Sequence, residues 1–288
     1  MEILTIVLSS LLSLAASGGA IADSVAASRL RSQVVRIEQQ AVRIDNTPSY
    51  QVAQGKLQKV RIATRGIIVK PNFRIEALEL ETDPIDLNLG QLNFDSIEQL
   101  QTSLDQPFKG ALRLVLTTAD LNWALQSPEI LSRIQQILNR QIVGKAGSTN
   151  ISYQLQELKL QLLPGDRLKI KLRLNRPRSL FETTRSDSSQ TKELLMNLEL
   201  GIKVLNGRTV QIVEPEGTVN GKPMSSRLLN GFAVGISDRL NLDFLTSDGI
   251  FARILQLDID EDKLELVSFL KVETKTSQLS SEEIKVVP

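Results

Sequence analysis

The 288-residue chain contains no histidine and no cysteine. The absence of histidine excludes a Ser-His-Asp triad and an imidazole proton shuttle. The absence of cysteine excludes thiolate nucleophiles, disulfides, iron-sulfur clusters and ordinary zinc sites. Any catalytic chemistry would rest on carboxylates, lysine, serine, threonine or tyrosine, and no spacing of these residues singles out a nucleophile. We therefore assign no catalytic residue and expect a protein that is not an enzyme.

Aromatic residues are also scarce, with one Trp, two Tyr and eight Phe. Stacking surfaces for bases or sugars are therefore few, and Leu, Ile and Val supply nearly all of the apolar mass. The formal net charge of +1 provides no overall attraction toward nucleic acid. We expect an aliphatic interior, no nucleic-acid partner and no cofactor.

Residues 3–22 carry no charged side chain and form the most hydrophobic stretch of the chain. Three interpretations fit this stretch. A secretory signal fits its length and the cleavage-like Ala20-Ile21-Ala22, although the residue before the stretch is Glu2 instead of a basic residue. A membrane anchor of about 20 residues, followed by Arg29 and Arg31, would leave the body of the protein on the cytoplasmic side. A buried core helix is the third interpretation.

Three segments show the apolar periodicity of amphipathic helices. They are residues 22–39, residues 118–143 with a restart at Ser127-Pro128-Glu129, and residues 223–240. The sequence Thr117-Thr118-Ala119-Asp120 has a capping-box-like spacing at the start of the second segment, and Gly144 can terminate it.

Alternating apolar and polar side chains predict strands, among them residues 60–62, 74–81, 85–89 and 113–116. Three hairpins follow: residues 158–174 around Pro164-Gly165-Asp166, 198–212 around Asn206-Gly207, and 255–269 around the tip at 260–263. Hairpins dominate, and no parallel crossover is needed. We predict an α+β fold, in which helices cover the apolar face of a long antiparallel sheet of hairpins.

The same pattern predicts the organisation of the chain. Residues 1–22 are the signal or membrane-anchor segment, residues 23–272 form a single α+β domain, and residues 273–288 are a polar tail. Residues 182–192 lack any apolar period and are predicted to be a mobile loop.

Charge is distributed in blocks. Residues 29–74 hold ten basic and two acidic side chains, whereas residues 75–105 hold eight acidic side chains and no basic one. The two blocks can face each other across neighbouring strands. A second basic stripe, formed by Lys169, Lys171 and Arg173, lies opposite the apolar face of its predicted strand. It is either an ordinary solvated face or a surface for anionic headgroups.

The densest carboxylate cluster is formed by Asp258, Asp260, Glu261 and Asp262. The spacing of an EF-hand and its glycine are missing, and a hairpin tip needs polar turn residues. We therefore interpret the cluster as a turn and assign no metal site.

With these elements in order, the chain resembles the LmeA-like phospholipid-binding family of bacterial envelope proteins. The resemblance covers nearly the whole chain, but it is a pattern of strands and turns without a catalytic signature. The matching stretches are the apolar start with its helix, Val42-Arg43-Ile44-Asp45-Asn46 with Pro48 and Gly55, Leu116-Thr117-Thr118-Ala119-Asp120-Leu121-Asn122, Leu163-Pro164-Gly165 and Val219-Asn220-Gly221-Lys222-Pro223.

The family is similar to tubular lipid-binding domains, in which a bent antiparallel sheet wraps a long helix and leaves an apolar groove for acyl chains. The resemblance thus implies phospholipid binding in the cell envelope, at a membrane surface, without an assigned reaction. The expected lining residues are Leu121, Leu125, Leu228, Leu229 and Phe232, with Lys169, Lys171 and Arg173 meeting the headgroup.

A second hypothesis stays open. The protein would be a membrane-anchored structural or assembly factor that binds a protein partner, unidentified from the sequence, through its sheet edge or its charged faces. Under this second hypothesis Leu, Ile and Val would fill a closed core, whereas under the lipid-binding hypothesis they would line an open groove. The body of the protein would lie on the periplasmic side if residues 1–22 are a signal, and on the cytoplasmic side if they are an anchor.

Overall fold

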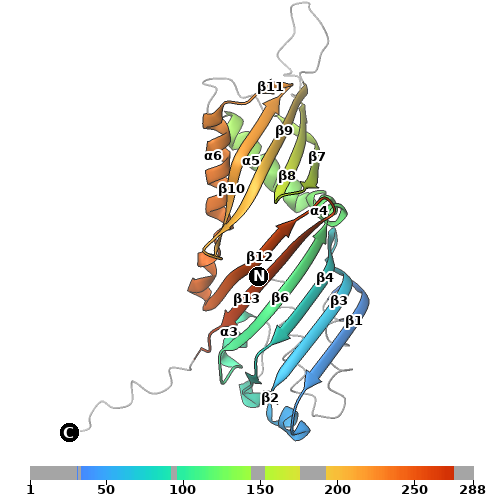
Figure 1. Ribbon diagram of the computed structural model, residues 1–288, viewed down its shortest axis with the longest axis vertical. Coiled ribbons are helices and arrows are strands. Elements are labelled where there is room, and N and C mark those ends of the chain that lie inside the picture. Colours follow the sequence, from blue (N-terminus) through green and yellow to red (C-terminus); the bar gives the residue numbers. More distant parts are fainter. Residues whose placement is uncertain (1–30, 32–33, 92–95, 144–152, 176–192, 276–288) are drawn as a thin grey trace, which may run out of the picture.

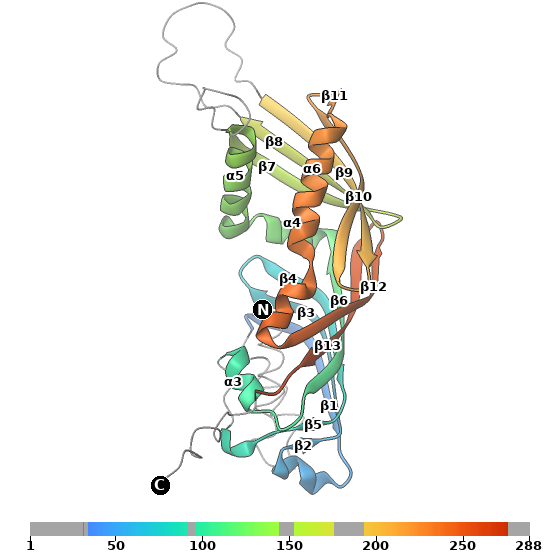
Figure 2. The same cartoon turned by 90° about the vertical axis from the view of Figure 1, so that its left-hand side faces the viewer.

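The computed structural model describes residues 31, 34–91, 96–143, 153–175 and 193–275. A six-stranded and a five-stranded antiparallel sheet follow one another along the long axis of the molecule (Figure 1). The helices α3 to α6 lie on one side of these sheets (Figure 2). The predicted α+β fold of antiparallel hairpins is therefore confirmed, and its strands are divided between two main sheets.

The six-stranded sheet buries one face and exposes much of the other. Alternate side chains along a strand point to opposite faces. Val60, Ile62 and Leu80 therefore lie in the main apolar cluster, while Arg61 and Glu81 between them are exposed. In spatial order the strands are β1 (Arg36–Asp45), β3 (Lys59–Lys70), β4 (Phe73–Thr82), β6 (Phe108–Thr117), β13 (Lys263–Val272) and β12 (Ile250–Ile259).

The two charge blocks meet on the exposed face, where β3 pairs with β4. Arg61 lies opposite Glu81 in the strand register. The Glu81 carboxylate accepts hydrogen bonds from Lys59 Nζ at 2.7 Å and from Arg61 Nε at 3.1 Å. Both hydrogen bonds lower the pKa of Glu81, and the one from Lys59 has the larger effect. The blocks thus face each other across neighbouring strands, as the sequence allowed, and such exposed pairs contribute little to stability.

The five-stranded sheet contains two of the predicted hairpins. In the second of them, Asn206 and Gly207 have φ values of 53° and 68°. Positive φ at both central residues is what a type I′ turn requires, and it matches the twist of the flanking strands. In spatial order the strands are β11 (Lys222–Pro223), β10 (Thr209–Val219), β9 (Glu193–Leu205), β8 (Arg167–Asn175) and β7 (Gln154–Leu163).

The predicted capping box at the start of α4 is confirmed. Thr117 Oγ1 accepts a hydrogen bond from Asp120 N at 3.1 Å, and Asp120 Oδ2 accepts one from Thr117 N at 3.0 Å. This pairing satisfies two of the amide groups that a helix start leaves free. The helical segments are η2 (Ser49–Gln54), η3 (Leu89–Gln91), α3 (Ile97–Thr102), α4 (Thr118–Leu125), α5 (Pro128–Val143), α6 (Ser226–Ser237), η4 (Asp238–Leu240) and η5 (Leu242–Asp248).

Two hairpin tips of the five-stranded sheet contact β12, the edge strand of the six-stranded sheet. Ile254 N donates to Gly207 O at 2.7 Å. At the other tip, Asp166 N donates to Ile259 O at 3.4 Å, and Asp166 Oδ1 accepts from Ile259 N at 2.8 Å. These contacts hold the two sheets end to end with their helices on one side.

Three predicted boundaries are wrong. The helix predicted over residues 22–39 does not reach its end, because Arg36 begins β1 and pairs with β3. The helix predicted over residues 223–240 begins at Ser226 and gives way to η4 after Ser237, because Lys222–Pro223 forms β11. The strand predicted over residues 85–89 is limited to β5 (Ile85–Asp86), which pairs only with β2 (Lys56–Leu57). Residues 1–22, 182–192 and 276–288 lie outside the described residues.

Candidate functional site

One face of the five-stranded sheet is apolar throughout. Cross-strand partners such as Leu160 and Ile170, or Ile170 and Leu198, bring leucines and isoleucines side by side. Six side chains of this face are buried: Leu162, Leu172, Leu174, Met196, Leu200 and Ile212. Others remain only half-buried, among them Leu158, Leu160, Leu168, Ile170, Leu194, Leu198, Ile202 and Val219. The helices therefore cover this apolar face incompletely.

The helix α6 lies along β10 at one edge of this face. Its Leu229 and Ala233 are buried, and Ala233 packs with Leu200 and Ile212 of the sheet. Ser237 Oγ accepts a hydrogen bond at 2.9 Å from Ile212 N. That amide points away from β9, toward the free edge of β10, so Ser237 marks the outer side of α6.

The opposite side of α6 therefore faces the middle of the sheet. At 100° per residue, Leu228 and Phe232 lie on the side of the helix away from Ser237, and Ile236 lies on the flank between them and Ser237. They follow each other at four-residue intervals and form one stripe. Leu228 and Phe232 are half-buried, and Ile236 is exposed. This stripe borders the half-buried part of the apolar sheet face.

The helix α5 crosses the same face of the sheet, from the side of α4 and β7 toward α6 (Figure 1). Ile134 packs against the cluster of Leu172, Leu174 and Met196. Gln135 fixes the helix to the chain that leads into β7, because its side-chain amide donates to Tyr153 O and accepts from Leu155 N at 2.8 Å. The helix α6 thus packs on β10, whereas α5 reaches β7 and, through Ile134, the buried residues of β8 and β9.

The helix α4 closes the edge of β7. Asn122 Nδ2 donates to Leu160 O at 2.7 Å, and Asn122 Oδ1 accepts from Leu160 N at 2.8 Å. These two bonds replace the partner strand that β7 lacks on this side, which protects the edge from pairing with another chain. The stretch from Leu116 to Asn122 thus has a structural role in the fold.

The five predicted lining residues fall into two groups. Leu228, Leu229 and Phe232 lie on α6, which packs on β10, and Leu121 and Leu125 lie on α4, which packs on β7 and β4. Leu229 is buried, and the other four are half-buried. The two groups thus lie by opposite edge regions of the five-stranded sheet.

Other apolar side chains at this face are not among the predicted lining residues. Ile170 and Leu198 lie in the middle of the sheet, Ile134 is on α5, and Ile236 is on α6. The alternation within the hairpins identified the sheet residues as apolar. It did not indicate which of them the helices leave half-exposed.

The predicted headgroup residues lie on the opposite face of β8. Lys169, Lys171 and Arg173 alternate with the apolar side chains of that strand. Arg173 pairs with Glu157 at 3.4 Å and with Glu193 at 3.2 Å. A sheet thus separates these side chains from the half-buried apolar face. Their role in headgroup binding stays a prediction, and this position weighs against it.

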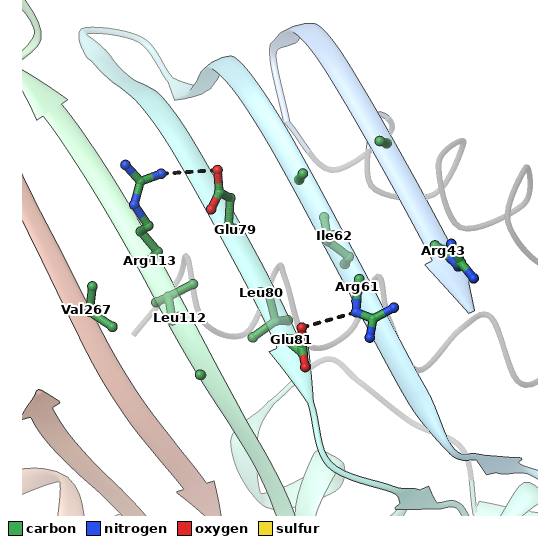
Figure 3. A pocket seen from close by; sticks show the side chains of 12 residues that line it. Arg43, Arg61, Ile62, Glu79, Leu80, Glu81, Leu112, Arg113 and Val267 are labelled. Atoms are coloured by element: carbon green, nitrogen blue, oxygen red, sulfur yellow. Dashed lines mark hydrogen bonds and ion pairs between the residues drawn. The ribbon is translucent and has the colours of Figure 1, made fainter. Parts of the chain in front are cut away.

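A shallow depression of about 360 Å³ lies on the exposed face of the six-stranded sheet (Figure 3). Its residues are Ala41, Arg43, Arg61, Ile62, Ala63, Glu79, Leu80, Glu81, Ala111, Leu112, Arg113 and Val267. Arg113 pairs with Glu79 at 3.1 Å, and Arg61 pairs with Glu81 at 3.1 Å. Because the guanidinium groups are matched by carboxylates, the depression has little free charge with which to hold an anion.

The described residues offer few groups for catalysis. Arg113 lowers the pKa of Glu265 by donating a hydrogen bond of 2.7 Å, against a smaller effect of burial in the other direction. That shift belongs to an ion pair on the sheet surface. No three carboxylates in the described part of the chain come together in a way that could hold a metal ion. No described helix has the length and apolar character to cross a bilayer.

These features define a class of protein: an antiparallel α+β protein in which helices incompletely cover a wide aliphatic sheet face. The chain belongs to the LmeA-like phospholipid-binding family, whose model matches residues 15–268. The resemblance noted in the sequence is thereby confirmed, and the family supports lipid binding in general. No curated protein and no solved structure gives a significant match to the chain.

Proposed function

We propose that this protein is a non-catalytic phospholipid-binding protein of the bacterial cell envelope. It holds acyl chains against the apolar face of the five-stranded sheet, between α5 and α6. One observation carries the proposal: many aliphatic side chains of that face are only half-buried, although the face is apolar along its whole width. Exposed apolar area of this kind commonly marks a binding surface.

An acyl chain is the ligand that suits such a surface. It needs contact area and no directional bonding, and each buried methylene contributes about 0.8 kcal/mol. Ile170 and Leu198 of the sheet and Phe232 of α6 are available for this contact. Leu121 and Leu125 on α4 would extend the lining at the end of the face near β7.

The competing hypothesis is a membrane-anchored structural or assembly factor that binds a protein partner. Two observations disfavour it. Asn122 caps part of the free edge of β7, which is one of the sheet edges such a partner could extend. The charged faces are internally paired, as Arg173 is with Glu157 and Glu193. The side of the membrane follows from residues 1–22: the periplasmic side for a signal, and the cytoplasmic side for an anchor.

The test compares two neighbouring residues of β9 that point to opposite faces. Leu198→Gln places a polar amide on the apolar face, whereas Asn197→Gln puts the same new side chain on the polar face. Native mass spectrometry of the delipidated full chain, after incubation with phosphatidylglycerol, should show bound lipid for the wild type and Asn197→Gln. Leu198→Gln should bind about fivefold less, while circular dichroism shows both variants folded.

Equal lipid binding by both variants, or no uptake by the wild type, contradicts the proposal. Lys171→Gln in the same assay examines the headgroup prediction separately. If Lys171 meets the headgroup, this variant loses phosphatidylglycerol but keeps phosphatidylcholine. If it serves only the solvated face, it binds both lipids like the wild type.

A further inference from the structure

Exposed apolar side chains are concentrated in the segment that follows the buried part of α6. Ten large apolar side chains are exposed in the described part of the chain. Four of them lie within eleven residues: Val234, Ile236, Leu240 and Phe244. A soluble surface scatters such side chains singly, so this concentration calls for a partner.

The exposure rises steadily along the chain. Leu228 and Phe232 are half-buried over the five-stranded sheet, Ile236 is 36% exposed, Leu240 is 41% exposed and Phe244 is 60% exposed. Leu228, Phe232 and Ile236 form the stripe of α6, and Leu240 and Phe244 follow in η4 and η5, on either side of the extended residue Asn241. Figures 1 and 2 show these segments continuing one another along one side of the molecule. In chain order these five side chains form an apolar row that begins at the candidate lipid site and becomes more exposed toward η5.

Charge around the exposed end of this row is nearly balanced. Asp238 and Arg239 are neighbours in η4, and Asp248 is the last residue of η5. A further acid, Asp243, pairs with Arg208 at 3.2 Å. This surface therefore provides little electrostatic attraction for a strongly charged partner, such as nucleic acid or a strongly anionic surface. The partner must instead take up apolar side chains.

We propose that Ile236, Leu240 and Phe244 dock this protein on a lipid bilayer by inserting between the lipids of its outer layer. The inference rests on the proposed function and deepens it, because the inserted end of the row is continuous with the stripe of α6 that borders the acyl-chain site. A phospholipid is nearly insoluble in water as a monomer. A protein that takes one up therefore has to contact a bilayer, and this is the apolar surface that leads to its site.

The experiment measures binding of the full chain to phosphatidylcholine vesicles, with and without phosphatidylglycerol, by flotation. The double variant Leu240→Ser with Phe244→Ser should reduce the vesicle-bound fraction about tenfold. Tyr50→Ser is the matched control, because Tyr50 is 64% exposed and lies in η2, which contacts β2 at the end of the molecule away from the five-stranded sheet (Figure 1). It should bind like the wild type. Binding should depend little on salt, since the contact is apolar.

A second measurement reports insertion directly. Phe244→Trp adds a fluorophore to the single native Trp123. After subtraction of the wild-type signal, its emission should shift to the blue with vesicles and be quenched by brominated acyl chains. An unshifted emission overturns the proposal. So does a double variant that binds vesicles like the wild type, a Tyr50→Ser variant that loses as much, or a wild type that binds no vesicles.

The docking surface and the acyl-chain site can fail independently. A monomeric short-chain phosphatidylcholine reports the site without a bilayer, and the double variant should bind it as the wild type does. If the wild type binds vesicles but not this lipid, the proposed function fails. Ultracentrifugation examines a second copy as the partner: a dimer that the double variant abolishes, with vesicle binding unchanged, overturns docking on a bilayer.

Discussion

Replacing Asn122 by alanine should destabilise the protein through the edge of β7. The substitution removes the bonds of 2.7 Å and 2.8 Å to the carbonyl and amide of Leu160, and a bond of 2.8 Å from Asn122 Nδ2 to Thr118 O within α4. Each net hydrogen bond contributes about 1 kcal/mol, and the freed backbone groups are only half-buried, so water partly replaces the loss. Alanine regains about 0.6 kcal/mol of helix propensity. We therefore expect a loss of roughly 1–2 kcal/mol in the free energy of unfolding.

Urea unfolding followed by circular dichroism measures this loss, and hydrogen exchange should show faster opening at the Leu160 amide. Asn122→Asp separates hydrogen bonding from packing. It keeps the shape of the side chain but turns a donor into an acceptor that faces Leu160 O, so it should lose at least as much stability at neutral pH. Asn230→Ala, an exposed change on α6, is the control and should lose nothing. The reasoning is refuted if Asn122→Asp is as stable as the wild type, or if Asn122→Ala loses less than about 0.5 kcal/mol in the free energy of unfolding.

Two further predictions concern the sheets. Because Arg113 lowers the pKa of Glu265 below 4.5, the folded state gains stability above that value and loses it as the pH falls through the lowered pKa. Glu265→Gln should thus differ most from the wild type near neutral pH, and the gap in thermal midpoint should narrow as the pH falls below 4.5 and through the lowered pKa. Gly207→Ala should lose at least about 1 kcal/mol more than Gly165→Ala in chemical unfolding. Both glycines have positive φ, but only at Gly207 would a Cβ lie 2.8 Å from Ile254 O. Equal losses at the two glycines, or a pH-independent gap for Glu265→Gln, would show these contacts to be unimportant.

The hairpins were predictable because their signals are local. Asn206 and Gly207 specify a turn by their own conformational preferences, and the alternation on both sides sets the strands that the turn joins. The start of α4 was predictable for the same reason, since Thr117 and Asp120 are three residues apart.

The pairings between distant segments were not predictable. Residues 34–39 carry a pattern that fits a helix, and Arg36 becomes part of a strand only because β3 is available beside it. Local periodicity contains no information about that neighbour. The division of the strands between two sheets follows from the same kind of distant pairing.

The candidate site was predictable in kind but not in detail. Leu228 and Phe232 on α6 could be named from the helical period. Ile170 and Leu198 of the sheet have the same apolar character as the buried Leu172, and only the positions of α5 and α6 determine which of them stays half-exposed.

The pairing of β6 with β13 affects the folding of the chain during its synthesis. Strand β6 (residues 108–117) pairs with β13 (residues 263–272), which is the last of the described strands to be synthesised. Until then β6 has a free edge of ten residues rich in leucine and valine, the kind of strand that pairs with other chains. A growing chain therefore carries an aggregation-prone edge through about half of its synthesis. Any truncation before residue 263 leaves that edge permanently open.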